Sequence, residues 1–119
     1  MATFSKQKLS GSTDGKAIRL TATASPGTTI HATGTSASII DEIWLYAYNS
    51  SADAQLLTIQ FGGTAVPNDD IKQIIPSQSG LTLVVPGLFL TGTGAAANTV
   101  AGYAAGSAVT ISGYVNRIS

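Results

Sequence analysis

The chain has 119 residues, no cysteine, and six basic against six acidic side chains, which gives a formal net charge of zero at pH 7. This length suits one domain with a core of its own, and the lack of cysteine excludes disulfides, thiolate metal sites and a cysteine nucleophile. Charged residues make up 10% of the chain, well under the roughly 25% usual for soluble domains. Their scatter along the chain argues against nucleic-acid binding, which needs clustered basic residues. A net charge near zero also gives little repulsion against self-association.

The first segment, residues 1–16, is polar and contains no continuous apolar stretch. We therefore expect no secretory signal peptide. Its composition predicts a flexible arm that becomes ordered on a partner, and a disordered tail without a partner is the alternative. The isolated apolar anchors and the basic residues of this arm are Phe4, Leu9, Lys6 and Lys8.

From residue 17 onward the apolar residues recur with a period of two, which is typical of strands, and turn residues separate the strands. The predicted strands cover 16–23, 28–33, 38–49, 55–63, 71–76, 81–86, 88–92, 98–106 and 108–119. No window has the period of an amphipathic helix. We therefore expect an all-β fold, a single-domain antiparallel β-sandwich over residues 17–119 that is jelly-roll-like and has about eight or nine short strands.

The strand predicted over 38–49 contains the stretch DEIWLYAYN and is apolar on both faces. Because side chains alternate along a strand, its aromatic residues share one face and its aliphatic residues share the other. These two sets are Trp44, Tyr46 and Tyr48, and Ile43, Leu45 and Ala47. The aliphatic face suits the core between two sheets. The aromatic face is covered either by the N-terminal segment or the Gly/Ala-rich residues 92–106, or by a partner subunit.

The most hydrophobic region, residues 81–90, is interrupted by Pro86 and Gly87. It is too short to cross a bilayer, so we expect neither a membrane span nor a membrane partner. The chain is expected to be made in the cytoplasm.

The sequence offers little for catalysis or for binding a metal or a cofactor. The one histidine, His31, has no second histidine or cysteine beside it for a metal site and is expected to be structural. The run Asn68-Asp69-Asp70 lacks the spacing of a calcium loop and predicts a capped turn instead. Asp41 and Glu42 are adjacent in a strand, so their carboxylates point to opposite faces and cannot form an acid/base couple. We expect no enzyme, no cofactor and no catalytic or metal-binding residue.

Several short motifs occur in a characteristic order along the chain. They are SPGTTIHATG, DEIWLYAYNSS, LTIQFGG, LVVPGL and the closing ISGYVNRIS. In this order they resemble a family of small virion structural proteins of tailed bacteriophages, and the resemblance covers the chain from about residue 15 onward. It implies a non-enzymatic protein of the phage particle, of the capsid decoration or cement type. It also implies binding to the outer shell, formed by the major capsid protein, as a homo-oligomer, with a trimer favoured and a dimer possible.

Two alternatives remain beside a decoration protein. The chain could be another virion part, such as a head-tail joining, tail or fibre-associated protein that binds through an edge strand. It could also be a small carbohydrate-binding sandwich, in which an exposed aromatic ring stacks on a sugar. The residues that these hypotheses place at an interface are Phe4, Lys6, Lys8, Leu9, Trp44, Tyr46, Tyr48 and Tyr103.

Overall fold

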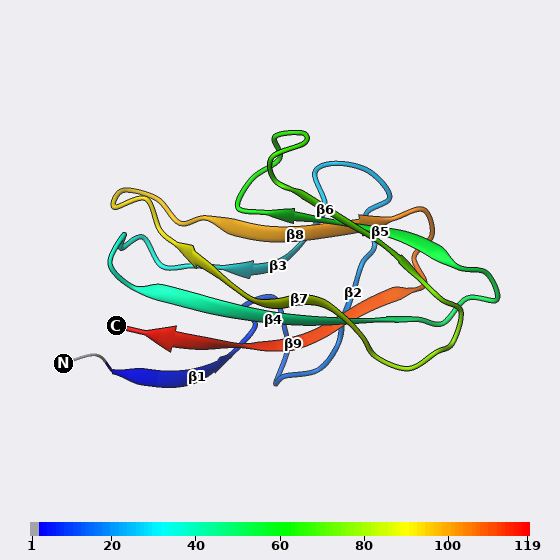
Figure 1. Cartoon of the computed structure of the whole chain (residues 1–119), viewed down its shortest axis with the longest axis horizontal. Coiled ribbons are helices and arrows are strands. Elements are labelled where there is room, and N and C mark those ends of the chain that lie inside the picture. The colour runs from blue at the N-terminus through cyan, green and yellow to red at the C-terminus, as the bar shows by residue number, and fades with distance from the viewer. Residues whose placement is uncertain (1–2) are drawn as a thin grey trace.

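The computed structural model describes residues 3–119, and its regular elements are nine β-strands in two antiparallel sheets (Figure 1). Sheet A contains β1 (Phe4–Lys8), β2 (Ile18–Arg19), β4 (Ile40–Asn49), β7 (Thr82–Thr91) and β9 (Val109–Ile118). Sheet B contains β3 (Thr28–Ala32), β5 (Gln55–Phe61), β6 (Asp70–Ile75) and β8 (Thr99–Ala104). The described residues include no helix long and apolar enough to cross a membrane. The prediction of an all-β, two-layer antiparallel sandwich is confirmed.

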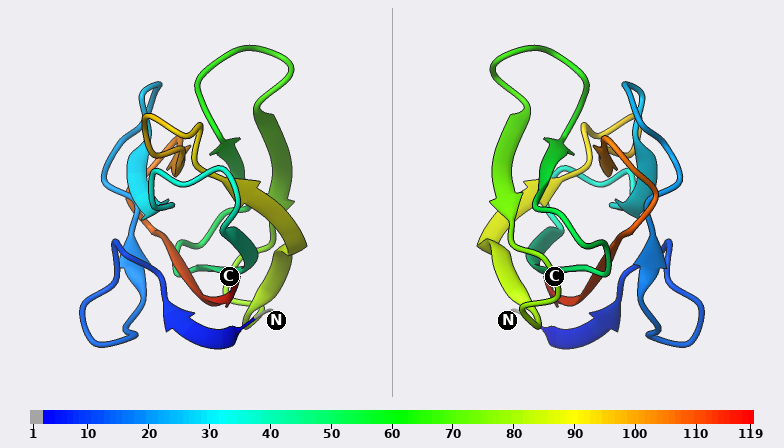
Figure 2. Two further views of the ribbon diagram at one scale, coloured as in Figure 1. Left: turned by 90° about the vertical axis from the view of Figure 1, so that its left-hand side faces the viewer. Right: turned by 90° about the vertical axis from the view of Figure 1, so that its right-hand side faces the viewer.

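The strand order is that of a jelly roll. Sheet A runs β1-β9-β4-β7 and sheet B runs β3-β8-β5-β6, while β2 pairs with the same edge of β9 as β1. If β1 and β2 are counted as one interrupted strand, the fold has eight strands. The first of these pairs with the last, β3 pairs with β8, β4 pairs with β7, and β5 pairs with β6. Figure 2 shows the two layers from either end, with the loop that joins β5 to β6 projecting beyond them.

The core lies between the two sheets and follows from strand alternation. In β4, each second residue is buried from Asp41 to Asn49, and Ile43, Leu45 and Ala47 are fully buried. Sheet B supplies the facing apolar residues, among them Leu57 and Ile59. Burying these side chains on both inner faces provides the main favourable free energy of the fold.

The N-terminal segment differs from the expected flexible arm over residues 1–16. Residues 4–8 form β1, which pairs in register with β9 from Tyr114 to Ile118, and Leu9 is 1% exposed within the core. The physical reason is that β2 covers β9 only at Thr110 and Ile111, so that the rest of this edge has backbone groups that need partners. Residues 1 and 2 of the expected arm lie outside the described residues.

Two predicted strands are joined into one. The strands expected over 81–86 and 88–92 form the single strand β7, because a register shift opposite Trp44 accommodates Pro86 and Gly87 as a bulge. The strand predicted over 98–106 is confirmed as β8, a thin strand inside sheet B. Its Gly102 leaves room for Ile30 and Ile59, whose Cδ1 atoms would each lie 3.2 Å from an added Cβ.

Candidate interaction surfaces

The outer face of sheet A carries the aromatic residues of β4. Trp44, Tyr46 and Tyr48 alternate with the fully buried aliphatic residues and are themselves half-buried. This confirms the predicted division of the strand into an aromatic and an aliphatic face. The N-terminal segment does not fold over this face, because β1 lies beside β9 as a further strand of the same sheet. Residues 99–104 do not cover it either, because β8 belongs to sheet B.

Four strands contribute to a row of packed groups on this face. The rings of Trp44 and Tyr114 are stacked, with centroids 6.2 Å apart and an interplanar angle of 14°. The Nζ of Lys6 lies 4.8 Å from the Tyr114 ring centroid, a cation–π distance. Beside Trp44, Gly87 has a φ of +78°, and a Cβ there would lie 2.8 Å from Trp44 Cζ2. The Trp44 ring therefore has Tyr114 and the backbone of Gly87 as neighbours, and its faces are poorly placed to receive a flat ligand.

Glu42 forms a polar centre on the same face. Its Oε1 accepts a hydrogen bond from Trp44 Nε1 at 2.7 Å and another from Asn116 Nδ2 at 3.2 Å. These hydrogen bonds, first that from Trp44, hold the pKa of Glu42 below its ordinary value, so the residue is an anion at neutral pH. A shallow pocket of about 230 Å³ adjoins it. The pocket is lined by Phe4, Ser5, Lys6, Glu42, Asn116 and Ile118.

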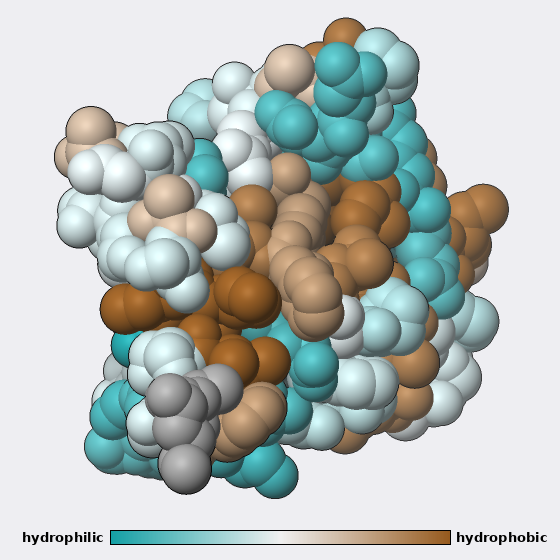
Figure 3. Space-filling model, turned by 60° about the vertical axis from the view of Figure 1, so that its left-hand side comes forward, coloured by the Kyte–Doolittle hydropathy of each residue, from teal (hydrophilic) through white to brown (hydrophobic). Residues whose placement is uncertain are grey.

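The edge strand β7 exposes apolar side chains. Leu83, Leu88 and Phe89 are 43%, 41% and 62% exposed, and the sequence TLVVPGLFLT contains no charged residue. Within the described residues β7 pairs with β4 on one side only, so its other edge is free. Figure 3 shows apolar residues gathered in a band between paler lobes on the side of the molecule that carries the termini.

The eight predicted interface residues separate into three places. Lys8 is in register with Tyr114, which puts it on the outer face of sheet A with Phe4, Lys6 and the aromatic residues of β4. Leu9 is in the core and cannot be an interface residue, because it is 1% exposed. Tyr103 is on β8 in sheet B. The neighbouring Gly102 faces core side chains, so strand alternation places the side chain of Tyr103 on the outer side of that sheet. Leu56 and Ile74 are exposed on the same outer side.

A buried polar cluster lies on the inner side of sheet A. Asp41, 1% exposed, accepts hydrogen bonds from Arg117 Nε to its Oδ1 at 2.8 Å and from an Arg117 terminal nitrogen to its Oδ2 at 3.0 Å. His31 Nε2 lies 2.8 Å from Asp41 Oδ2. Burial acts to raise the pKa of Asp41, but the hydrogen bonds from Arg117 and His31 outweigh it and hold that pKa below its ordinary value.

The second ring nitrogen of His31 shows how this cluster is held. Its Nδ1 accepts a hydrogen bond from the backbone N–H of Ser10 at 3.0 Å. Since Nδ1 is an acceptor, the proton of neutral His31 is on Nε2 and is donated to Asp41. The cluster thus joins the segment after β1 to β3, β4 and β9, which agrees with the structural role expected for His31. Sequence reasoning did not find Arg117, because the partner is 76 residues away and only the pairing of β4 with β9 brings it opposite Asp41.

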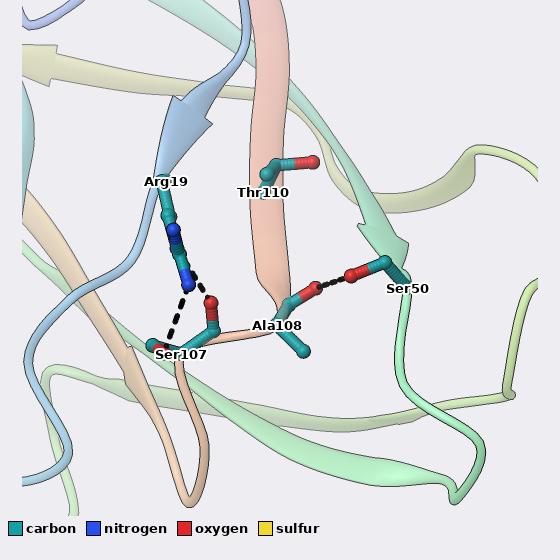
Figure 4. A pocket seen from close by; sticks show the side chains of 5 residues that line it. All are labelled: Arg19, Ser50, Ser107, Ala108 and Thr110. Atoms are coloured by element: carbon teal, nitrogen blue, oxygen red, sulfur yellow. Dashed lines mark hydrogen bonds between the residues drawn. The ribbon is translucent and has the colours of Figure 1, made fainter.

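The pocket at Arg19 has no catalytic character. It has a volume of about 410 Å³ and is lined by Arg19, Ser50, Ser107, Ala108 and Thr110 (Figure 4). Arg19 donates from Nε to the backbone oxygen of Ser107 at 2.8 Å and from a terminal nitrogen to Ser107 Oγ at 3.1 Å. Ser50 Oγ donates to the backbone oxygen of Ala108 at 3.0 Å. Neither a histidine nor a carboxylate lines the pocket, so its hydroxyl groups have no side-chain base beside them.

The acidic run before β6 forms a turn, as predicted. Asp69 Oδ2 accepts a hydrogen bond from the backbone N–H of Ala65 at 3.0 Å, and the backbone N–H of Asp69 donates to the oxygen of Ala65 at 2.9 Å. Within residues 3–119, no group of three or more His, Asp or Glu side chains has the arrangement of a metal site.

Comparisons with protein-family models, with curated proteins and with solved structures gave no match. Leu83 and Phe89 of β7 pair with Tyr46 and Glu42, so they extend the outer face of sheet A to its free edge. This face and its edge form the surface on which a function is argued.

Proposed function

We propose that this chain is a non-enzymatic structural protein of a bacteriophage particle, a decoration or cement protein that binds the outer capsid shell and stabilises it. The single observation that supports an assembly role most is the free, uncharged and apolar edge of β7. The place in a phage particle is supported by the ordered sequence motifs that resemble phage virion proteins.

The argument from β7 is one of physical chemistry. An exposed strand edge pairs readily with other chains, and natural proteins usually protect such edges with charged residues, prolines, bulges, short strands or covering loops. β7 has ten residues, no charge, and the exposed side chains of Leu83, Leu88 and Phe89. Pro86 and two register shifts, opposite Ile43/Trp44 and Leu45/Tyr46, protect part of this edge, but they leave these side chains exposed. Such an edge is suited to a partner, and a repeating shell offers many equivalent partners and gains stability from the number of weak contacts.

The described residues offer no comparable support for catalysis. Asp41 and His31 are within hydrogen-bond reach of each other, but both are 1% exposed and are committed to Arg117 and Ser10. The pocket at Arg19 has no side-chain base. A sugar-binding role for Trp44 is disfavoured because its ring packs against Tyr114 and Gly87. A different virion component, such as a head-tail joining, tail or fibre-associated protein, would use the same edge and is the second candidate.

The proposed function is tested by binding to shells assembled from the major capsid protein of the same phage. We expect the purified protein to sediment with these shells and to saturate at a fixed ratio to the capsid subunit. Phe89→Glu should weaken this binding at least about tenfold, because a charge would be desolvated in the contact. Ile74→Glu is the matched control, since Ile74 is equally exposed at 65% but lies on sheet B. Failure of the wild-type protein to sediment with the shells at any concentration would overturn the proposal.

A further inference from the structure

Three successive rows of residues cross the outer face of sheet A, and β9 forms their middle. The register of β1 and β4 on β9 defines the rows as Phe4, Ile118 and Ile40, then Lys6, Asn116 and Glu42, then Lys8, Tyr114 and Trp44. In every row the first residue comes from β1 and the last from β4. β1 and β4 lie on opposite sides of β9. A half-turn about an axis parallel to β9 therefore exchanges their positions.

A second copy can be placed on this face by such a rotation. Two sheets that pack face to face keep their strands within about 30° of each other, and two identical faces that contact each other are related by a two-fold axis. When that axis runs parallel to β9 and above it, β9 lies over β9 of the second copy, and β1 of each copy lies over β4 of the other. Each β1 residue then meets the β4 residue of its own row.

The residues brought together in this way are chemically complementary in all three rows. Phe4, 72% exposed, meets the apolar Ile40. Lys6 meets Glu42, which is held as an anion by its hydrogen bonds to Trp44 and Asn116. Lys8 meets Trp44, whose indole offers an apolar surface to the hydrocarbon stem of the lysine. Each pairing occurs twice because the contact is symmetric. Because the net charge of the chain is zero, there is little electrostatic repulsion between two copies.

We infer that the outer face of sheet A binds the same face of a second copy, in a two-fold dimer in which Lys6 of each chain pairs with Glu42 of the other. This dimer goes beyond the proposed function, and its basis does not depend on a shell. For a shell-binding protein, the dimer would double the number of β7 edges in each assembly unit and so strengthen attachment.

Light scattering across a dilution series tests the dimer directly. We expect the wild-type protein to have the mass of two chains at high concentration and to dissociate on dilution. Lys6→Glu and Glu42→Lys should each raise the dissociation constant at least about tenfold, because each creates two pairs of like charges across the axis. Trp44 is the only tryptophan of the chain, so its emission should change with dissociation.

An equimolar mixture of the two variants is the decisive measurement. One chain then has two acidic and the other two basic side chains at these positions, and we expect a heterodimer to form at wild-type concentrations. A merely structural role for Lys6 or Glu42 would not produce this rescue, and the rescue also shows that both variants are folded. Ile74→Lys on the outer side of sheet B is the control and should leave the dissociation constant unchanged.

Four results would overturn the dimer. They are a wild-type monomer at all concentrations, a trimeric mass, a mixture of variants that stays monomeric, and dissociation by Ile74→Lys as strong as that by Glu42→Lys. These results are separate from the test of the proposed function. A monomer that sediments with shells would retain the proposed function without the dimer, and a dimer that does not sediment would retain the dimer without the function.

Discussion

Asp41 and Glu42 are neighbours in β4, but their carboxylates lie on opposite sides of sheet A and have different partners. Asp41 is 1% exposed and is bound by Arg117 and His31 between the sheets. Glu42 lies on the outer face and accepts hydrogen bonds from Trp44 and Asn116. Both carboxylates are anions at neutral pH, since both pKa values are lowered. The comparison shows that one strand can hold a charge that stabilises the fold on one side and a charge that is available for recognition on the other.

The largest expected effect is that of Asp41→Asn. Removing the buried anion leaves Arg117 without its charge partner and changes the hydrogen bond of His31, which should lower the free energy of unfolding by about 3 kcal/mol. This value is at the lower end for a buried pair because Arg117 is 33% exposed and can reach water. Urea unfolding followed by Trp44 fluorescence measures it. A loss under about 1 kcal/mol would mean that the inner cluster contributes no more than a surface ion pair.

The second prediction concerns the packing that holds Trp44 on the outer face. Gly87→Ala should lower the free energy of unfolding by about 2 kcal/mol, because φ is +78° and the new Cβ would meet the indole at 2.8 Å. Gly80→Ala is the matched control, since φ is +75° and no atom lies within 4 Å of its Cβ. It should cost only the backbone strain, about 1 kcal/mol. Equal losses in the two variants, with unchanged Trp44 emission in both, would contradict the packing of Gly87 on Trp44.

The third prediction is the pH dependence that Asp41 confers. Its pKa is lower in the folded than in the unfolded chain, so its stabilisation is present above its ordinary pKa of 3.8 and is lost as the pH falls through the folded value. The free energy of unfolding should therefore decrease as acid is added below that ordinary value. Urea titrations at a series of pH values should show a shallower decrease for Asp41→Asn than for the wild-type protein. If the free energy of unfolding fell equally with pH in both proteins, Asp41 would not be the source of the acid sensitivity.

The smallest expected effect on stability is that of Glu42→Gln. The amide oxygen can still accept from Trp44 Nε1 and Asn116 Nδ2, and the residue is at the surface, so the urea midpoint should stay close to that of the wild-type protein. The dissociation constant of the dimer should nevertheless rise several-fold, because the pair with Lys6 loses its charge. Asp41→Asn should show the reverse pattern, a large stability loss with little direct effect on pairing. The comparison fails if both variants change stability equally.

Much of the fold could be predicted from the sequence, because strand alternation and turn residues are local signals. Most strands were predicted near their observed places, including β4 with its aromatic and aliphatic faces. The role of residues 4–8 could not be predicted, because a short polar strand is stable only when a neighbour offers a free edge, here that of β9. For the same reason, Pro86 and Gly87 indicated a break, whereas pairing with β4 carries β7 across them as a bulge.

The candidate surfaces were predictable only in part. Trp44, Tyr46 and Tyr48 were identified as an aromatic face, and Phe4, Lys6 and Lys8 join that face because β1 extends sheet A. Glu42 was considered only as a partner for Asp41, and its place in the same row as Lys6 depends on the register of β1 and β4 on β9. The apolar residues Leu83 and Phe89 were seen as strand residues, and only the strand order shows that they lie on an edge.

The sequence by itself determined the all-β class, the period of the strands, the low charge and the residues that β4 presents to each side, since these depend on residue type and on neighbours in the chain. The tertiary structure decided the jelly-roll order, the pairing of Asp41 with Arg117, the free edge of β7 and the three complementary rows on sheet A. The physical reason is that antiparallel pairing joins residues far apart in sequence. Their register is set by the whole core and not by any local segment.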